Sequence, residues 1–111
     1  MATADECELA LHRLADRLAA HGGRPGFDRS LSCTLPDLGI AFGGRLAAGQ
    51  LVEIARAESR AAASAQIRLT MSSNDLLALV DGGLKFGPAW ASGRVRIDAS
   101  VRDLLRLRAL L

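Results

Sequence analysis

Residues 67–111, IRLTMSSNDLLALVDGGLKFGPAWASGRVRIDASVRDLLRLRALL, decide the fold because their local patterns follow one another with almost no spacer. Their periodicities predict, in order, a strand at 67–71, a short helix at 72–81, an irregular aromatic segment at 84–90, a strand at 94–98 and a helix at 100–111. No pair of residues in this stretch is arranged to make or break a covalent bond. We therefore expect a binding module and not an enzyme.

Both predicted helices of this stretch begin with a capping box. Ser72 is followed by Asp75, and Ser100 by Asp103, so that a hydroxyl and a carboxylate can satisfy backbone groups left free at each helix start. The glycine pair at 82–83 ends the first of the two helices, because glycine readily adopts the left-handed conformation of a helix stop.

The predicted terminal helix has more apolar surface than one contact face needs. At about 100° per residue its apolar positions span a wide arc, formed by Val101, Leu104, Leu105, Leu107 and Leu111. Arg102 and Arg106 lie opposite this arc, whereas Arg108 falls inside it. We expect the arc to close over a sheet, to line a cavity or to meet another protomer.

The residues before this stretch supply another helix and most of a sheet. Thr3 and Glu6 form a capping box, and Gly22 and Gly23 end the helix that it opens. The period then changes to two, which predicts four strands at 31–35, 40–46, 51–57 and 65–71. Tight turns and a polar loop around Ser59 join them into an antiparallel meander, and the strand at 94–98 should add to its edge through a helical crossover.

Length and composition indicate one α+β domain that occupies residues 1–111, with a single core. Half of the residues are hydrophobic and the mean hydropathy is +0.18. Charged residues nevertheless interrupt every apolar run before the ~20 residues that a membrane span needs. Acidic Asp5, Glu6 and Glu8 stand where a secretion signal would be basic. We expect a soluble cytoplasmic protein, and the abundance of alanine and arginine suggests a bacterial source.

Positive charge is concentrated at the end of the chain. The net charge is +2, whereas residues 94–111 contain five arginines and two aspartates, which gives 5 − 2 = +3. A nucleic-acid surface would add stacking aromatics, but there is no tyrosine, one tryptophan and three phenylalanines. Nucleic acid is therefore not an expected partner. Anionic headgroups, a carboxylate-bearing ligand and plain solvation all remain open for these arginines.

The usual residues of catalytic and metal sites do not form recognisable motifs. Cys7 and Cys33 are too far apart for a metal knuckle and are expected to be small buried hydrophobes. His12 belongs to a polar helix face, and His21 to a helix end. No zinc, calcium or nucleophile motif is present, so the sequence predicts no catalytic residue, no metal and no cofactor.

Three large apolar residues, Leu84, Phe86 and Trp90, lie in the segment that has no regular period. Such a segment loses backbone entropy without a hydrogen-bonded ladder in return. Its side chains should therefore either fill the core or line the rim of an opening between sheet and helices.

The order of these elements resembles the sterol carrier protein type two family. The resemblance is carried by a strand, a capped helix, a loop with proline and an aromatic residue, a basic-apolar strand and a leucine-rich helix. Here these are residues 67–71, Ser72-Ser73-Asn74-Asp75-Leu76-Leu77, Pro88-Ala89-Trp90, Ser92-Gly93-Arg94-Val95-Arg96-Ile97 and residues 103–111.

The resemblance implies a five-stranded mixed, mainly antiparallel sheet covered by helices. It also implies noncatalytic binding or transfer of a lipid or other hydrophobic small molecule, of the sterol, fatty acid or acyl-CoA class, in an apolar pocket between the sheet and the helices. The residues that it places at the pocket are Leu77, Leu84, Phe86, Trp90, Leu104, Leu107 and Leu111. Arg108 is a candidate for holding an acidic headgroup, with snorkelling to solvent as its other role. The alternative is a homodimeric interaction module, or an accessory module that works with a separate enzyme.

Overall fold

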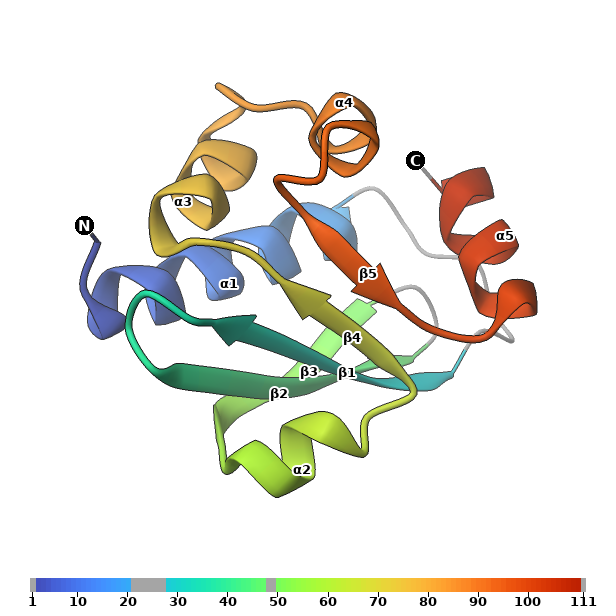
Figure 1. The fold of residues 1–111 in the computed structure, drawn as a ribbon, viewed down its shortest axis with the longest axis horizontal. Helices are drawn as coiled ribbons and strands as arrows, with labels where there is room; N and C mark the ends of the chain where they lie inside the picture. The colour runs from blue at the N-terminus through green and yellow to red at the C-terminus, as the bar shows by residue number, and fades with distance from the viewer. Residues whose placement is uncertain (1, 21–27, 48–49, 111) are drawn as a thin grey trace.

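The computed structural model describes residues 2–20, 28–47 and 50–110, with the backbone only at 17–20, 86 and 106–110 (Figure 1). Within these ranges the chain forms five helices and five strands. In chain order they are α1 (Ala4–Ala20), β1 (Arg29–Leu35), β2 (Ile40–Ala47), β3 (Gln50–Ala57), α2 (Ser59–Ala63), β4 (Ile67–Thr70), α3 (Ser73–Asp81), α4 (Phe86–Ala91), β5 (Arg96–Asp98) and α5 (Val101–Leu110). The predicted α+β class is confirmed.

The strands form one mixed sheet in the order β3-β2-β1-β4-β5. β1 and β2, β2 and β3, and β4 and β5 pair antiparallel, whereas β1 and β4 run parallel, with Leu31 opposite Ile67. The expected five-stranded, mainly antiparallel sheet is thus confirmed, and so is the position of the last strand at an edge.

The prediction that all four early strands form a meander is wrong for the fourth. β4 leaves the meander and pairs with β1, and the residues predicted as a polar loop around Ser59 form helix α2 instead. Three consecutive alanines within this segment, at 61–63, favour a helix. A helical crossover is what a parallel pair requires, because no tight turn can reverse the chain twice.

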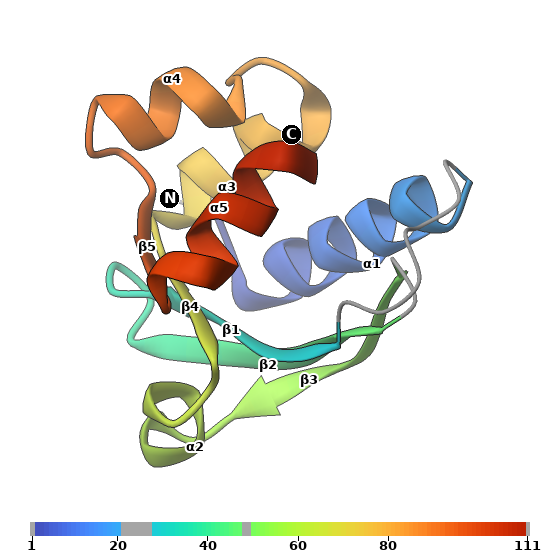
Figure 2. The same cartoon turned by 90° about the vertical axis from the view of Figure 1, so that its right-hand side faces the viewer.

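The helices cover the two faces of the sheet unequally. α1, α3, α4 and α5 lie on one side, and α2 lies on the other (Figure 2). Ser32, on the α2 side of β1, is only 2% exposed and its Oγ donates a hydrogen bond to the Ala62 carbonyl at 2.9 Å. Both faces of the central strand are therefore buried, which the alternating pattern of 31–35 did not indicate.

The core lies between the sheet and the four helices α1, α3, α4 and α5. Its largest fully buried side chains include Phe42, Leu35 and Ile67. Cys7 and Cys33 belong to the same cluster, which confirms them as small buried hydrophobes. Burial raises the pKa of the Cys33 thiol to about 12 and also raises the pKa of Cys7, so neither is a thiolate near neutral pH.

The predicted helix starts are largely confirmed by their hydrogen bonds. The Thr3 amide donates to Glu6 Oε1 at 3.0 Å, and the Glu6 amide donates to Thr3 Oγ1 at 3.2 Å. Ser72 Oγ accepts from the Asp75 amide at 3.1 Å. Gly82, with φ at +87°, ends α3 as expected. The expected end of α1 at Gly22 and Gly23 lies outside the described residues, and so do residues 48–49, which join the strands predicted at 40–46 and 51–57.

The segment 84–90, predicted as irregular, contains helix α4. The Ala89 amide donates to the Lys85 carbonyl at 3.0 Å, and the Ser92 amide donates to the Pro88 carbonyl at 2.9 Å. Pro88 lies in the first turn, where a missing amide hydrogen costs no intrahelical bond. The segment has no regular apolar period because a helix of 6 residues is too short to show one.

Candidate functional site

Half of the predicted pocket residues have side chains that pack against the core. Leu77 lies in α3, Leu84 between α3 and α4, Trp90 in α4 and Leu104 in α5. All four side chains are half-buried and pack against the same core cluster. Residues from three helices and a connecting loop thus form a partly exposed apolar layer over the core.

The other predicted pocket residues cannot be placed in the same way. Phe86 lies in α4, and Leu107 and Arg108 lie in α5, at positions where the structure describes only the backbone. Leu111 lies outside the described residues. A role in a pocket stays a prediction for these four residues.

A fully buried layer lies beneath the half-buried one. Leu76 and Val80 on α3 are each 2% exposed, and Ala89 on α4 is 1% exposed. On the sheet side they meet Val95, which is inaccessible to solvent. The Val95 amide donates to the Ala89 carbonyl at 3.1 Å, which joins α4 to the start of β5. The sheet side of the candidate site is therefore closely packed and gives a rigid support to the layer above.

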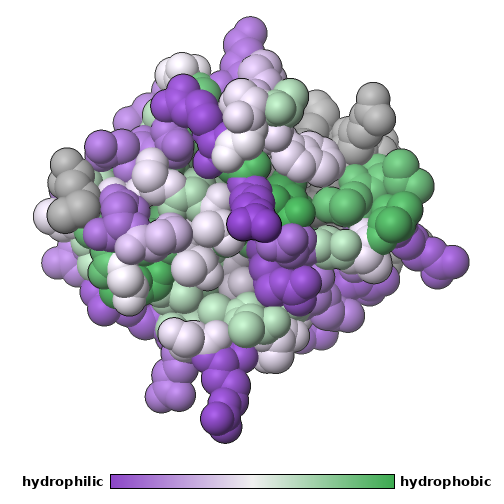
Figure 3. All heavy atoms as spheres, in the orientation of Figure 1, coloured by the Kyte–Doolittle hydropathy of each residue, from purple (hydrophilic) through white to green (hydrophobic). Residues whose placement is uncertain are grey.

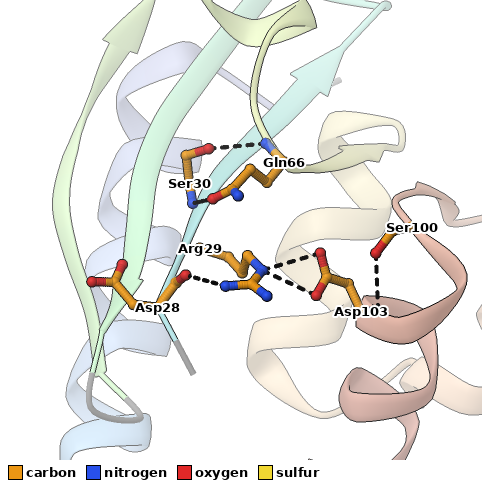
Figure 4. A network of polar contacts seen from close by, with 6 residues as sticks. All are labelled: Asp28, Arg29, Ser30, Gln66, Ser100 and Asp103. Carbon is orange, nitrogen blue, oxygen red and sulfur yellow. Dashed lines mark hydrogen bonds and ion pairs between the residues drawn. The ribbon is translucent and has the colours of Figure 1, made fainter. Parts of the chain in front are cut away.

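An ion pair holds the start of α5 to the sheet (Figure 4). Arg29 Nε on β1 donates to both carboxylate oxygens of Asp103, at 3.0 and 3.2 Å. Asp103 is 5% exposed, and its amide donates to Ser100 Oγ at 3.2 Å. The predicted cap by Ser100 is confirmed, while the carboxylate of Asp103 binds Arg29. This pairing was missed because a distant arginine cannot be matched to a capping aspartate by spacing.

A second pair of hydrogen bonds fixes the neighbouring strand end. The Ser30 amide donates to Gln66 Oε1 at 3.0 Å, and the Gln66 amide donates to Ser30 Oγ at 2.9 Å (Figure 4). These bonds join the start of β1 to the residue before β4. The start of β1 is therefore held by two adjacent residues, since Arg29 binds α5 and Ser30 binds the residue before β4.

A third polar network joins α3 to the turn between β1 and β2. The Ser73 amide donates to Asp37 Oδ1 at 3.0 Å, and Ser73 Oγ donates to Asp37 Oδ2. The Ala2 amide donates to Ser73 Oγ at 3.2 Å. The hydrogen bonds from Ser73, led by its hydroxyl, hold the pKa of the Asp37 carboxyl below its ordinary value. The contact of Asp37 with α3 was not predicted, because Asp37 and Ser73 are 36 positions apart in the sequence.

The outward side of α5 exposes two large apolar residues. Val101 is 74% exposed and Leu105 is 62% exposed. Figure 3 shows hydrophobic surface gathered where α5 lies, at the right of the view. The described part of α5 thus contributes Leu104 to the core side and two apolar residues to solvent. This outcome agrees with an apolar arc that is wider than one contact face.

Within the described residues, no group of three or more histidine, cysteine, aspartate or glutamate side chains could hold a metal ion. The same part of the chain contains no helix that is both long and apolar enough to cross a membrane.

No sequence profile of a known protein family matches the chain, and no curated protein matches it. Solved structures do match. Sterol carrier protein 2 like 2 from Aedes aegypti aligns with a TM-score of 0.64 at 17% identity, over 96% of this chain and 96% of that one. The sterol carrier protein 2 of the same mosquito, solved in complex with palmitate, aligns with a TM-score of 0.60 at 16% identity, over 99% and 96%.

An enzyme also contains this fold. The inverting sec-alkylsulfatase from a Pseudomonas species aligns with a TM-score of 0.58 at 20% identity, over 88% of this chain and 16% of the enzyme. These likenesses show that the chain has the sterol carrier protein 2 fold, which confirms at the level of fold the resemblance seen in the sequence.

Proposed function

We propose that the chain binds or transfers a lipid or another hydrophobic small molecule, without catalysis, between the sheet and helices α3, α4 and α5. The observation that carries the proposal is the half-buried layer of Leu77, Leu84, Trp90 and Leu104. These side chains are apolar, come from separate elements and are incompletely covered, although they pack against a buried core. Small-molecule sites are typically apolar, with a few polar groups at their edge.

The fold supports a fatty acid as the first ligand to test, because a mosquito protein of the same fold was solved with palmitate. The predicted sterol and acyl-CoA ligands belong to the same proposal. Phe86, Leu107 and Leu111 are proposed to extend the apolar lining. Arg108 is proposed to hold an acidic headgroup.

The test is a titration of purified protein with palmitate while the emission of Trp90, the single tryptophan of the chain, is followed. Binding should shift the emission, because Trp90 is half-buried and lies in the proposed lining. Mass spectrometry of an organic extract of the protein should identify any ligand that it carries from its host. A protein that yields no ligand and whose Trp90 emission ignores palmitate, sterol and acyl-CoA would contradict the proposal.

A matched pair of variants separates binding from stability. Leu84→Ser removes apolar contact from the proposed lining and should weaken palmitate binding about tenfold. Leu38→Ser changes another half-buried leucine of the same core cluster. It lies in the turn between β1 and β2, far from α4 and α5 in Figure 1, and should leave the affinity unchanged. Equal losses in both variants would show that the effect reflects the fold and not the site.

A second candidate is an interaction module, which is favoured by the exposed apolar residues of α5. As a homodimer it should show a concentration-dependent mass by light scattering. As an accessory module it would work beside a separate enzyme, in the way that this fold forms a small part of the alkylsulfatase chain. Affinity capture from the source organism that recovers no enzyme would remove support for the accessory role.

A further inference from the structure

Helix α5 has an apolar stripe on its outward side where a surface helix normally has polar residues. Val101 and Leu105 are separated by about one helical turn, so they form one continuous stripe, which we call the outer stripe. Leu104 packs against the core, and Asp103 is buried in its ion pair with Arg29. The contacts of α5 with the sheet are thus made by other residues, and the outer stripe, at 74% and 62% exposure, is free to contact something else.

A basic residue, Arg102, follows Val101 directly in α5. Arg102 is exposed and forms no ion pair within the part of the chain that the structure describes. It lines a shallow polar depression of about 560 Å³ at the start of α5, together with Arg29, Gln66, Ser100 and Asp103. The sequence of α5 contains three arginines and one aspartate, or 3 − 1 = +2. Since Asp103 is paired with Arg29, Arg102 is the α5 arginine whose described side chain adds positive charge to the exposed surface.

We propose that α5 docks the protein onto an anionic lipid surface. The outer stripe enters the boundary between headgroups and acyl chains, and Arg102 with the neighbouring depression contacts the lipid phosphates. The biological reason for docking rests on the proposed lipid-carrying function, because a carrier must collect and release its ligand at a membrane. The structural argument for docking uses only the residues of α5 and its surroundings.

The combination of apolar and basic residues distinguishes this partner from a second copy of the chain. Two stripes placed face to face would bring together two surfaces that each carry an exposed, positively charged Arg102, which disfavours association. An anionic bilayer offers apolar depth to Val101 and Leu105, and a negative potential to Arg102. Two apolar side chains and few charges give weak and reversible binding to the membrane, as a carrier that leaves again requires. This binding should weaken as the salt concentration is raised.

The test is flotation of ligand-free protein with vesicles of phosphatidylcholine alone or of an equimolar mixture with phosphatidylserine. The protein should float with the mixed vesicles at low salt and should bind pure phosphatidylcholine at least about tenfold less. Arg102→Glu should lower the partition coefficient about fivefold or more, since one basic side chain near an anionic surface contributes about that factor. Val101→Asp with Leu105→Asp should lower it by at least about tenfold.

Two control variants make the same chemical changes elsewhere. Leu9→Asp alters a leucine of α1 that is 54% exposed. Arg60→Glu alters an exposed arginine of α2, on the opposite side of the sheet (Figure 2). Both controls should float like the unmodified protein. The proposal is overturned if either control loses binding as strongly as the α5 variants, or if the unmodified protein shows no preference for phosphatidylserine.

Two further measurements separate this proposal from the proposed function and from self-association. The α5 variants should keep the palmitate response of Trp90 in solution, because Val101, Arg102 and Leu105 all face solvent. If the unmodified protein floats with the mixed vesicles but its Trp90 emission does not respond to palmitate, the result counts against ligand binding and not against docking. Light scattering that shows a dimer dissociated by Leu105→Asp would assign the outer stripe to a second copy and would reject the lipid surface.

Discussion

Helices α1 and α5 lie on the same side of the sheet, yet they are buried to very different extents. On α1, Cys7, Ala10 and Leu11 are between 0% and 6% exposed. A pocket between Leu11 of α1 and sheet residues such as Phe42 holds only about 10 Å³, about what one water requires. On α5, Leu104 is half-buried and Leu105 is exposed. An apolar helical pattern therefore shows that a helix has a face to cover, but it does not show whether this chain covers it.

The largest loss of stability is expected from a substitution in the core beneath α1. Phe42 on β2 is 1% exposed and belongs to the main core cluster. Phe42→Ala should lower the free energy of unfolding by about 3–5 kcal/mol, because it leaves a cavity in a filled region. Urea denaturation followed by circular dichroism measures the change. A loss below about 1 kcal/mol would mean that the core around Phe42 is packed as loosely as the surroundings of α5.

An intermediate effect is expected where α5 is held to the sheet. Asp103→Ala removes the carboxylate that binds Arg29 and should lower the free energy of unfolding by about 2 kcal/mol. The Arg29 side chain is 27% exposed, so water can replace part of the lost contact. The cost should therefore stay below that of breaking a fully buried pair. Asp103→Asn is the matched control, because it keeps the shape and should recover part of the loss.

If Asp103→Ala left the stability unchanged in denaturation experiments, the ion pair would not hold α5. The position of the helix would then depend on Leu104 and its neighbours. Hydrogen exchange of the α5 amides distinguishes the two cases, because loss of the ion pair should increase exchange in α5 before it does so in α1.

A smaller effect is expected from acid at the β1–β2 turn. The pKa of the Asp37 carboxyl is lowered in the fold by hydrogen bonds from Ser73. A lowered pKa stabilises the fold above the ordinary value of about 3.9, and this contribution is lost as the pH falls through the folded value. Asp37→Asn should therefore flatten the acid limb of a plot of melting temperature against pH. An unchanged acid limb in this variant would show that other carboxylates, such as Glu6, determine it.

The sequence was sufficient to predict the elements that are determined locally. Capping residues such as Ser72 and Ser100, the stop at Gly82 and the two-residue period of most strands depend on neighbours in the chain, and they are confirmed. The parallel pairing of β4 with β1 depends on where a crossover returns, which no period encodes. Helix α4 was not predicted, because its 6 residues are too few to show a helical period.

The candidate site was predictable to a different degree. The family resemblance implies a pocket role for Leu77, Leu84, Trp90 and Leu104, and all four pack against the core, while the pocket role itself stays a prediction. The polar supports were not predictable, because Arg29 with Asp103, and Asp37 with Ser73, are separated by 74 and 36 positions. Contacts between such distant residues follow from the topology of the sheet and not from any local pattern.

The smallest effect is expected on the outer side of α5, where a pair of leucines gives the direct contrast with α1. Leu11→Ala on α1 removes a side chain that is 6% exposed and should cost about 2–5 kcal/mol. Leu105→Ala removes one that is 62% exposed and should change the free energy of unfolding by no more than about 0.5 kcal/mol. Alanine is also a good helix former, so the helix itself should not suffer. A loss above about 1 kcal/mol for Leu105→Ala that grew with protein concentration would show that another copy covers the outer stripe, because stability then depends on association.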